Sequence, residues 1–293
     1  MRPRVTATPL VLVIVAAVLH ATWNLVLKQS GGSGLRFFLL VSIVECLLLL
    51  PLALGQCAFD GYAPPAEAYL RMVVSGVVHI AYFLFLGYGY RSGQLSVVYP
   101  LARATGPLLS IVGAVVILGE QPAPVALGGA LAVGLGAIML TGNPFALGNR
   151  GGLRGIGFSL ATGAMIAVYT IWDQMAVKGL LVKPTIYYGG SILVRLLLLM
   201  PFALRDSAAV VGEWRKRRIA VIFVGVLSPL SYLLVLFAMQ LAQLSYVAPL
   251  REISILFAAL LGTQLLREGE AARRLTAAVV MIAGFLAIAL GGK

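Results

Sequence analysis

The chain has 293 residues, of which 60% are hydrophobic and only 11% are charged, and its mean hydropathy is +0.99. A soluble domain of this composition would expose apolar patches far larger than a soluble monomer tolerates, which excludes a soluble globular protein. The formal net charge of +12 is typical of membrane proteins that keep Lys and Arg in cytoplasmic loops, so we expect no nucleic-acid binding.

In chain order, the sequence contains about ten apolar runs, each long enough for a helix to cross a hydrocarbon core of about 30 Å. We therefore expect an all-α integral membrane protein with ten transmembrane helices and with connections too short to hold a soluble domain. The first run is interpreted as a mature helix rather than a cleaved signal peptide. The predicted spans lie near 9–28, 35–54, 69–90, 95–118, 123–141, 153–177, 184–204, 219–240, 244–266 and 272–291.

Cysteine and histidine are scarce. Cys46 falls inside the second predicted helix and Cys57 just beyond it, so we expect two free thiols and no disulfide framework. The only histidines are His20 and His79, and no Cys/His cluster has metal-ligand spacing, so we expect neither a metal nor a cofactor. The sequence also has no GxxxxGK[ST] phosphate-binding loop, which excludes a single-chain ATP-driven pump.

One phrase occurs twice in the chain. Residues 94–103 read QLSVVYPLAR, and residues 243–252, which are 149 positions later, read QLSYVAPLRE. The same offset relates Trp23 and Asn24 to Trp172 and Asp173. Each copy therefore contains about five helices, and an odd number of crossings inserts the second copy upside down relative to the first. We predict two inverted five-helix repeats, residues 1–145 and 146–293, which is an architecture of secondary transporters.

Three stretches carry a family resemblance: WNLVLK at 23–28, PLARATGPLLSIVGAVVILGE at 100–120, and APLREISILFAALLGTQLLREGE at 248–270. Over nearly its whole length, as two domains, the chain resembles the EamA-type drug/metabolite transporter superfamily. The resemblance implies ten helices, alternating access and usually export of a small metabolite or amino acid. Arg267 replaces the glycine found at Gly119 in the first copy, so we carry no role over to Glu268 and interpret it as a loop residue.

Small residues recur at intervals of four, which lets helix backbones approach closely in a membrane. The sixth predicted helix has such a face, and so has the fifth. Their members are Gly151, Gly155, Ser159, Gly163 and Ala167, and Gly128, Ala132 and Gly136.

Six formal charges lie within predicted helices, and each costs roughly 2.5–3.5 kcal/mol at the bilayer centre unless it faces protein or water. Three are acidic and three basic, so they either pair structurally or line a central cavity. Arg251 and Glu252 are adjacent and point about 100° apart, so at least one must reach another helix. Asp173 lies nearer a helix end, where an interfacial salt bridge is the simpler interpretation. The six are Glu45, Arg103, Asp173, Arg195, Arg251 and Glu252.

Neutral polar residues share helix faces with several of these charges. Tyr99 lies one turn from Arg103, and His79 lies near Tyr82 in the third helix. Membrane-interface anchoring is the main alternative for the tryptophans, and a hydrogen-bonded structural role is the main alternative for His79. The predicted substrate-binding or coupling residues are Glu45, Arg103, Arg251, Glu252, Tyr99, His79, Asn24, Trp23, Tyr82, Arg195, Trp172 and Asp173.

Two prolines recur with the repeat. Pro100 and Pro249 cannot donate a backbone hydrogen bond and press against the preceding turn, which kinks or breaks a helix. Broken backbone survives at membrane depth only where protein or a water-filled cavity supports it. Either proline alone can be a harmless kink, but their recurrence beside charged residues predicts a pair of hinges at the cavity.

The sequence favours a secondary transporter, an exporter or exchanger that moves a small amino acid, zwitterion or organic anion by alternating access around a central cavity. Coupling to protons or to a counter-substrate is open, and a monomer is sufficient although a dimer is also possible. A membrane-embedded enzyme is the first alternative, but we expect no enzyme because no catalytic arrangement of residues is evident. A non-transporting regulator or scaffold is the second alternative.

We expect the bacterial inner membrane as the location. If the N-terminus were cytoplasmic, the outside would hold about twice as many Lys and Arg residues as the inside, including the cluster at 215–218. The positive-inside rule therefore favours both termini outside.

Overall fold

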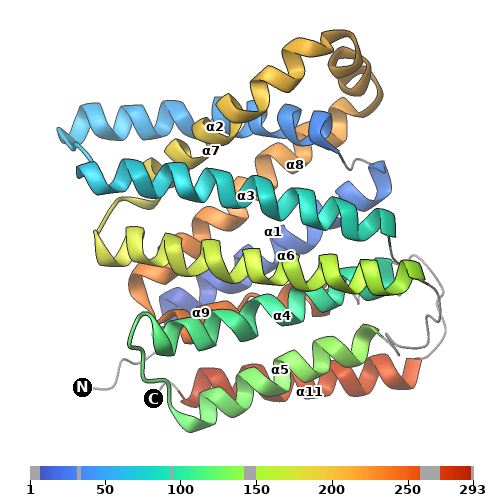
Figure 1. Ribbon diagram of the computed structural model, residues 1–293. Coiled ribbons are helices and arrows are strands. Elements are labelled where there is room, and N and C mark those ends of the chain that lie inside the picture. Colours follow the sequence, from blue (N-terminus) through green and yellow to red (C-terminus); the bar gives the residue numbers. More distant parts are fainter. Residues whose placement is uncertain (1–6, 32–33, 93–94, 142–149, 258–270, 292–293) are drawn as a thin grey trace.

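A computed structural model of the chain describes residues 7–31, 34–92, 95–141, 150–257 and 271–291. These residues form ten α-helices and no strands (Figure 1), which confirms the predicted fold class. A π-helical turn, Met175–Gly179, extends α6. The helices are α1 (Ala7–Ser30), α2 (Leu35–Asp60), α3 (Ala66–Ser92), α4 (Leu95–Val116), α5 (Pro124–Thr141), α6 (Arg150–Gln174), α7 (Pro184–Arg205), α8 (Ser207–Leu241), α9 (Leu244–Leu250) and α11 (Ala271–Gly291).

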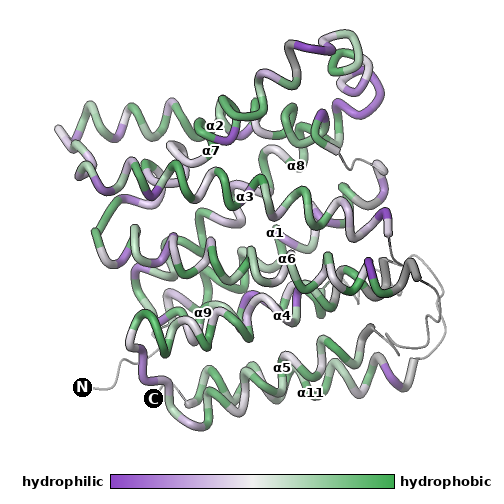
Figure 2. The backbone as a smooth tube through the Cα atoms, viewed as in Figure 1, coloured by the Kyte–Doolittle hydropathy of each residue, from purple (hydrophilic) through white to green (hydrophobic). Residues whose placement is uncertain are grey.

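The helices are apolar along most of their length (Figure 2). Six helical segments among the described residues, in α1, α2, α3, α6, α7 and α8, are long and apolar enough to cross a membrane, and shorter apolar segments lie in α4, α5 and α11. A helix satisfies its own backbone hydrogen bonds, which is what hydrocarbon requires of a spanning segment. The first described residue of α1 and the last of α11 lie at one end of the bundle, here called the termini face. The turn between α7 and α8 marks the other end, here called the α7–α8 face.

Helix pairing reveals the relation between the two halves. Helix α1 packs on α8, and α6 packs on α3. The duplication makes α1 equivalent to α6 and α3 equivalent to α8, so these are two copies of one contact. Helix α2 pairs with its equivalent α7, and α5 with its equivalent α11. This exchange of partners is what two inverted five-helix repeats require.

The α5–α11 contact depends on glycines. A Cβ built on Gly129 would lie 2.6 Å from the Gly284 carbonyl oxygen, and one built on Gly284 would lie equally close to the Gly129 carbonyl. A Cβ built on Gly136 would likewise lie 2.9 Å from the Ala277 carbonyl oxygen. The predicted face of α5 was wrong in one respect, because a Cβ on Gly128 would meet no atom within 4 Å. The smooth face therefore runs through Gly129 and Gly136.

The small-residue face of α6 packs as predicted from Gly155 to Ala167, while the surroundings of Gly151 are outside what the structure describes. A Cβ on Gly163 would lie 3.1 Å from the carbonyl oxygen of Ala102 in α4, and Ser159 is fully buried. Gly155 and Ala167 are buried as well. The backbones of α4 and α6 therefore approach closely along this face.

The ninth predicted span, 244–266, is not one continuous helix. Helix α9 ends at Leu250, Arg251 and Glu252 form a turn, and helical structure resumes over residues 253–257. The break follows Pro249, which lacks the amide hydrogen needed to bond one turn back. Pro100 lies within α4, but its side chain and that of Tyr99 are outside the described residues, as is Glu268. The role of the two prolines as hinges stays a prediction.

Candidate functional site

Asp173, near the end of α6, lies in the interior of the bundle with no exposed surface. The Tyr187 hydroxyl donates a hydrogen bond of 2.7 Å to one carboxylate oxygen, and the Tyr232 hydroxyl donates one of 2.5 Å to the other. Among the described residues, no cation lies within salt-bridge distance of this carboxylate. The predicted interfacial salt bridge is therefore wrong, because α7 and α8 cover this turn of α6 and supply hydroxyl donors instead.

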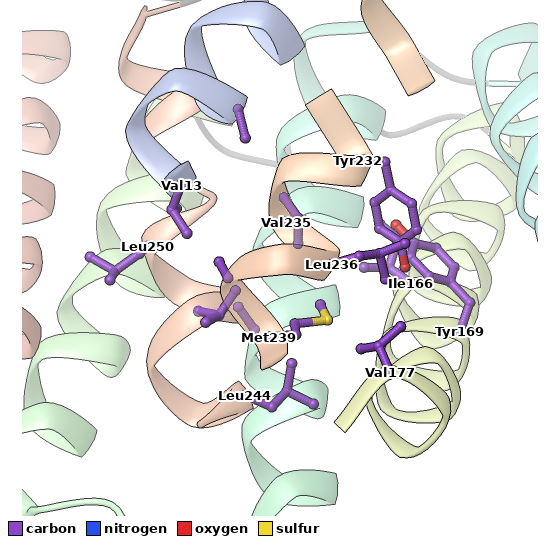
Figure 3. Close-up of a cluster of buried hydrophobic side chains, with 14 of the residues drawn as sticks. Val13, Ile166, Tyr169, Val177, Tyr232, Val235, Leu236, Met239, Leu244 and Leu250 are labelled. Carbon is purple, nitrogen blue, oxygen red and sulfur yellow. The ribbon is translucent and has the colours of Figure 1, made fainter. Parts of the chain in front are cut away.

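Aromatic rings surround this carboxylate. The His79 ring stacks on Tyr169 at 4.3 Å between centroids, and Tyr232 meets both rings edge-on at 5.6 and 5.7 Å. Tyr188 lies 5.0 Å from Tyr232. Figure 3 shows Tyr169 and Tyr232 side by side where α6 and α8 meet. We call His79, Tyr169, Tyr188 and Tyr232 the aromatic cluster.

His79 has a structural hydrogen bond, as one of its two interpretations expected. Its Nδ1 lies 2.8 Å from the Ser75 carbonyl oxygen, which can only accept, so Nδ1 carries a proton. The bond fixes the ring against Tyr169. Tyr82, one turn further along α3, is also buried and lies edge-on to Tyr169 at 5.9 Å. Both predicted residues of α3 therefore face the same interior region as Asp173.

The break after α9 directs its two charged residues to different helices, as their angular separation predicts. Glu252 pairs with Arg103 of α4 at 2.9 Å, and Arg103 also donates to the Ser254 hydroxyl at 3.1 Å. The Arg251 guanidinium lies 5.5 Å from the centroid of the Tyr232 ring in α8. Arg251, Glu252 and Arg103 are all more than nine-tenths buried.

A second buried ion pair joins the halves. Arg195 of α7 donates through Nη2 to the Glu45 carboxylate of α2, and its Nε donates to the Ser42 hydroxyl at 3.1 Å. Both ions are almost completely buried. The guanidinium also lies 5.6 Å from the centroid of Phe83. Four of the six intramembrane charges therefore pair with one another, as the structural alternative expected.

The remaining predicted residues lie away from this centre or contribute to helix contacts. Trp23 is only 5% exposed and packs among Phe37 and Val221, so interfacial anchoring is wrong for this residue. Trp172 is half-buried; its ring N–H donates to the Arg71 carbonyl at 3.0 Å, and the Arg71 guanidinium lies 4.8 Å from its ring centroid. Asn24 donates to the His20 carbonyl of its own helix at 2.8 Å.

A cavity of about 490 Å³ lies at the α7–α8 face, and a smaller one of about 210 Å³ adjoins it between α2 and α3. Both are bordered by Gly34, Leu35, Arg91 and Leu199. Phe83 lines the smaller cavity; its ring stacks on Phe38 at 4.2 Å, and the Arg195 guanidinium lies over it. Charged side chains line the larger cavity, namely Arg36, Arg91, Asp206, Glu213 and Arg217.

At the termini face, polar side chains tie the halves together. The Glu120 carboxylate accepts hydrogen bonds from the backbone amides of Leu244 (2.8 Å) and Ser245 (2.9 Å), and so caps the start of α9. Gly119 positions this carboxylate: its φ of 66° ends the fourth helix in a left-handed turn, and the Glu120 amide bonds back to the Ala114 carbonyl at 2.9 Å. Within the second half, Lys178 donates a hydrogen bond of 2.8 Å to the Ala242 carbonyl.

Comparison with known proteins agrees with this architecture. The model of the EamA-like transporter family matches residues 7–142 and 153–290. The chain belongs to the EamA-like transporter family. The two EamA matches correspond to the two repeats, although the predicted boundary between residues 145 and 146 falls outside the described residues. No curated protein sequence matches the chain.

The EamA-like fold also occurs in a solved structure titled "Crystal structure of protein". The similarity covers 97% of this chain and 98% of that one, with a TM-score of 0.78 and 16% sequence identity. This likeness shows a shared fold.

Several residues of the site were missed by sequence reasoning. Tyr187 and Tyr232 read as ordinary aromatic residues of apolar helices, and only the packing of α7 and α8 on α6 brings their hydroxyls to Asp173. Glu120 carried a signal, because its repeat counterpart Glu268 is also acidic, but the signal did not reveal which helix it would cap. No sequence pattern indicated that Phe38 and Phe83 would stack beside the cavity.

Proposed function

We propose that this protein is a secondary transporter of small polar metabolites that works by alternating access of its two inverted repeats. Its membership of a transporter family supports transport as the general function. The observation that carries the mechanism is the difference between the two faces: a cavity opens at the α7–α8 face, while α9 is capped from the opposite half at the termini face.

The charged interior supports a polar substrate. The smaller cavity, which adjoins the larger one, is lined by the stacked rings of Phe38 and Phe83. The Arg195 guanidinium of the buried Glu45–Arg195 pair lies 5.6 Å from the centroid of Phe83. Ionised groups at this depth are costly and mark substrate or ion pathways in membrane proteins. In the proposed cycle, the cavity closes at the α7–α8 face when the Glu120 cap opens at the other. Proton or counter-substrate coupling is part of the proposal as the energy source.

The distribution of Lys and Arg supports an orientation in the bacterial inner membrane. Arg36, Arg91, Arg217 and other basic residues gather at the α7–α8 face, where the larger cavity opens. By the positive-inside rule, this distribution supports a cytoplasmic position for this face, with both termini outside. A cavity open to the cytoplasm collects cytoplasmic substrate, which is the arrangement that an exporter needs.

Transport is tested with the purified chain in liposomes. The liposomes are loaded with a mixture of amino acids, organic acids and amines, diluted into the same mixture carrying heavy isotopes, and assayed for exchange by mass spectrometry. We expect exchange of at least one compound above protein-free liposomes. If none of the compounds exchanges under either an imposed pH gradient or symmetric conditions, the proposed function is overturned.

A further inference from the structure

We propose that Arg251 and Asp173 form one subsite that selects a zwitterion, with Arg251 binding the substrate's carboxylate and Asp173 its ammonium group. A free α-amino acid has this chemistry. The inference rests on the proposed transport function and names the substrate class of its central site.

The first support is the pairing of the buried charges. Four of the six intramembrane ions neutralise one another, as Glu45–Arg195 and Arg103–Glu252. Within the described part of the chain, the two left without a counter-ion at salt-bridge distance are Arg251 and Asp173. They have opposite signs. A buried ion without a counter-ion is destabilising, so we explain the retention of one ion of each sign by a ligand that supplies both counter-charges.

The second support is geometric, because Tyr232 touches both ions. Its hydroxyl donates to Asp173 at 2.5 Å, while the Arg251 guanidinium lies 5.5 Å from its ring centroid. Both charges therefore lie next to a single tyrosine side chain of the aromatic cluster, Asp173 at its hydroxyl and Arg251 near its ring. Arg251 also interacts with Tyr169, another member of that cluster.

The two groups have the chemistry to bind the two ends of a zwitterion. Tyr187 and Tyr232 each donate one hydrogen bond to Asp173, one to each oxygen, and a carboxylate has about four acceptor sites. The remaining sites suit an ammonium group, which has three donors. A guanidinium presents its donors as a planar fork that matches a carboxylate.

The charge balance of the interior selects a zwitterion over a simple ion. The six intramembrane charges sum to zero, three acidic and three basic, and the two other buried charges of the described residues, Arg71 and Glu120, also cancel. A bound anion or cation would leave one net charge in a low-dielectric region, whereas a zwitterion adds none. The site therefore fits a ligand that is neutral overall but charged at both ends.

Liposome exchange with three probe sets tests the proposal: the twenty proteinogenic L-amino acids, their N-acetyl derivatives and the corresponding amines without the carboxylate. The wild-type chain should exchange free amino acids and discriminate against both derivative sets. Asp173→Asn should lower exchange of free amino acids roughly tenfold or more, and relax discrimination against the N-acetyl anions. Arg251→Gln should cause a similar loss and relax discrimination against the amines instead.

Matched controls separate this selectivity from misfolding. Arg154→Gln and Asp60→Asn make the same chemical changes at exposed positions and should leave exchange and selectivity unchanged. A merely structural role for Asp173 or Arg251 would lower exchange of every probe equally, without the opposite shifts in selectivity, and would overturn the proposal. Exchange of organic anions or amines but not amino acids would overturn the zwitterion subsite while leaving transport intact. Absence of all exchange would contradict transport itself.

Discussion

Arg103 and Glu252 occupy the same position in the two repeats, each three residues after the repeated proline, and their side chains form an ion pair of 2.9 Å. Equivalent positions of two inverted repeats meet only near the axis that relates them. The Glu45–Arg195 pair also joins equivalent helices, α2 and α7. The two pairs therefore lie along the interface where the halves face each other.

Glu252→Gln should destabilise the protein by about 3–5 kcal/mol, because it leaves the Arg103 guanidinium buried beside a neutral partner. Asp60→Asn is the control, since it removes an acid from the partly exposed Lys183–Asp60 pair and should cost no more than about 1 kcal/mol. Thermal unfolding in detergent, followed by intrinsic fluorescence, measures both. Equal unfolding midpoints for the two variants would contradict the buried pairing.

Replacement of both Glu45 and Arg195 by apolar residues distinguishes a structural from a functional pair. Glu45→Leu or Arg195→Met alone should cost several kcal/mol, because each strands a buried ion. The double variant should recover most of that loss, since apolar residues of similar volume pack without desolvating charge. Unfolding midpoints test the folding energetics, and liposome exchange by the double variant then shows whether the charges themselves serve transport. A double variant no more stable than its parents would contradict this expectation.

Gly129→Leu should strongly destabilise the α5–α11 contact, because its side chain would enter the space taken by the Gly284 backbone. Overpacking of this kind costs about 1–3 kcal/mol or more. The neighbouring Gly128→Ala provides a matched control, since a methyl group there meets no atom within 4 Å, and alanine favours the helix. The prediction is checked by the melting temperature of each variant and fails if Gly129→Leu is as stable as wild type.

Glu120→Ala should loosen the start of α9 at the termini face, because two backbone amides lose a charged acceptor. Hydrogen bonds to charged groups contribute about 1.5–3 kcal/mol, so opening should become roughly tenfold or more frequent. The readout is the labelling rate of a Gln243→Cys reporter by a maleimide, with Cys46 and Cys57 replaced. Glu67→Gln changes a more exposed carboxylate at the same face and should leave that rate unaltered.

The orientation is checked with single-cysteine variants in intact cells. Ala63 is exposed at the termini face, and Ala208 is exposed at the α7–α8 face. A membrane-impermeant maleimide should label the Ala63→Cys variant from outside and should reach the Ala208→Cys variant only after the membrane is broken. The reverse pattern would place the termini in the cytoplasm and would contradict the Lys/Arg argument.

The number of helices, the inverted repeat and the separate partners of Arg251 and Glu252 could be predicted from the sequence, because each depends on a local pattern of residues. Apolar run length defines a span, an odd number of spans defines inversion, and the angle between Arg251 and Glu252 requires different partners. The break after Pro249 was also visible as a proline effect, although not its extent through Arg251 and Glu252.

The site depends instead on which helices meet, and one sequence does not specify this. Asp173 seemed interfacial because its position along α6 was known but the covering of that turn by α7 and α8 was not. The interpretation of Trp23 as an interfacial anchor was wrong for the same reason, because the side chains that bury it belong largely to α2 and α8. Gly129 and Gly128 are neighbours in a smooth helix, and only the direction of α11 decides which one is in contact.

The opposite signs in the Arg103–Glu252 ion pair restrict which polypeptides can assemble, because these two residues occupy equivalent positions. If the first half associated with a second copy of itself in the same antiparallel manner, Arg103 would face Arg103. Self-association of the second half would oppose Glu252 to Glu252. Like charges repel strongly when buried, so both homodimers are disfavoured and only the unlike combination is neutral. The single chain therefore behaves as an obligate heterodimer whose subunits happen to be covalently joined.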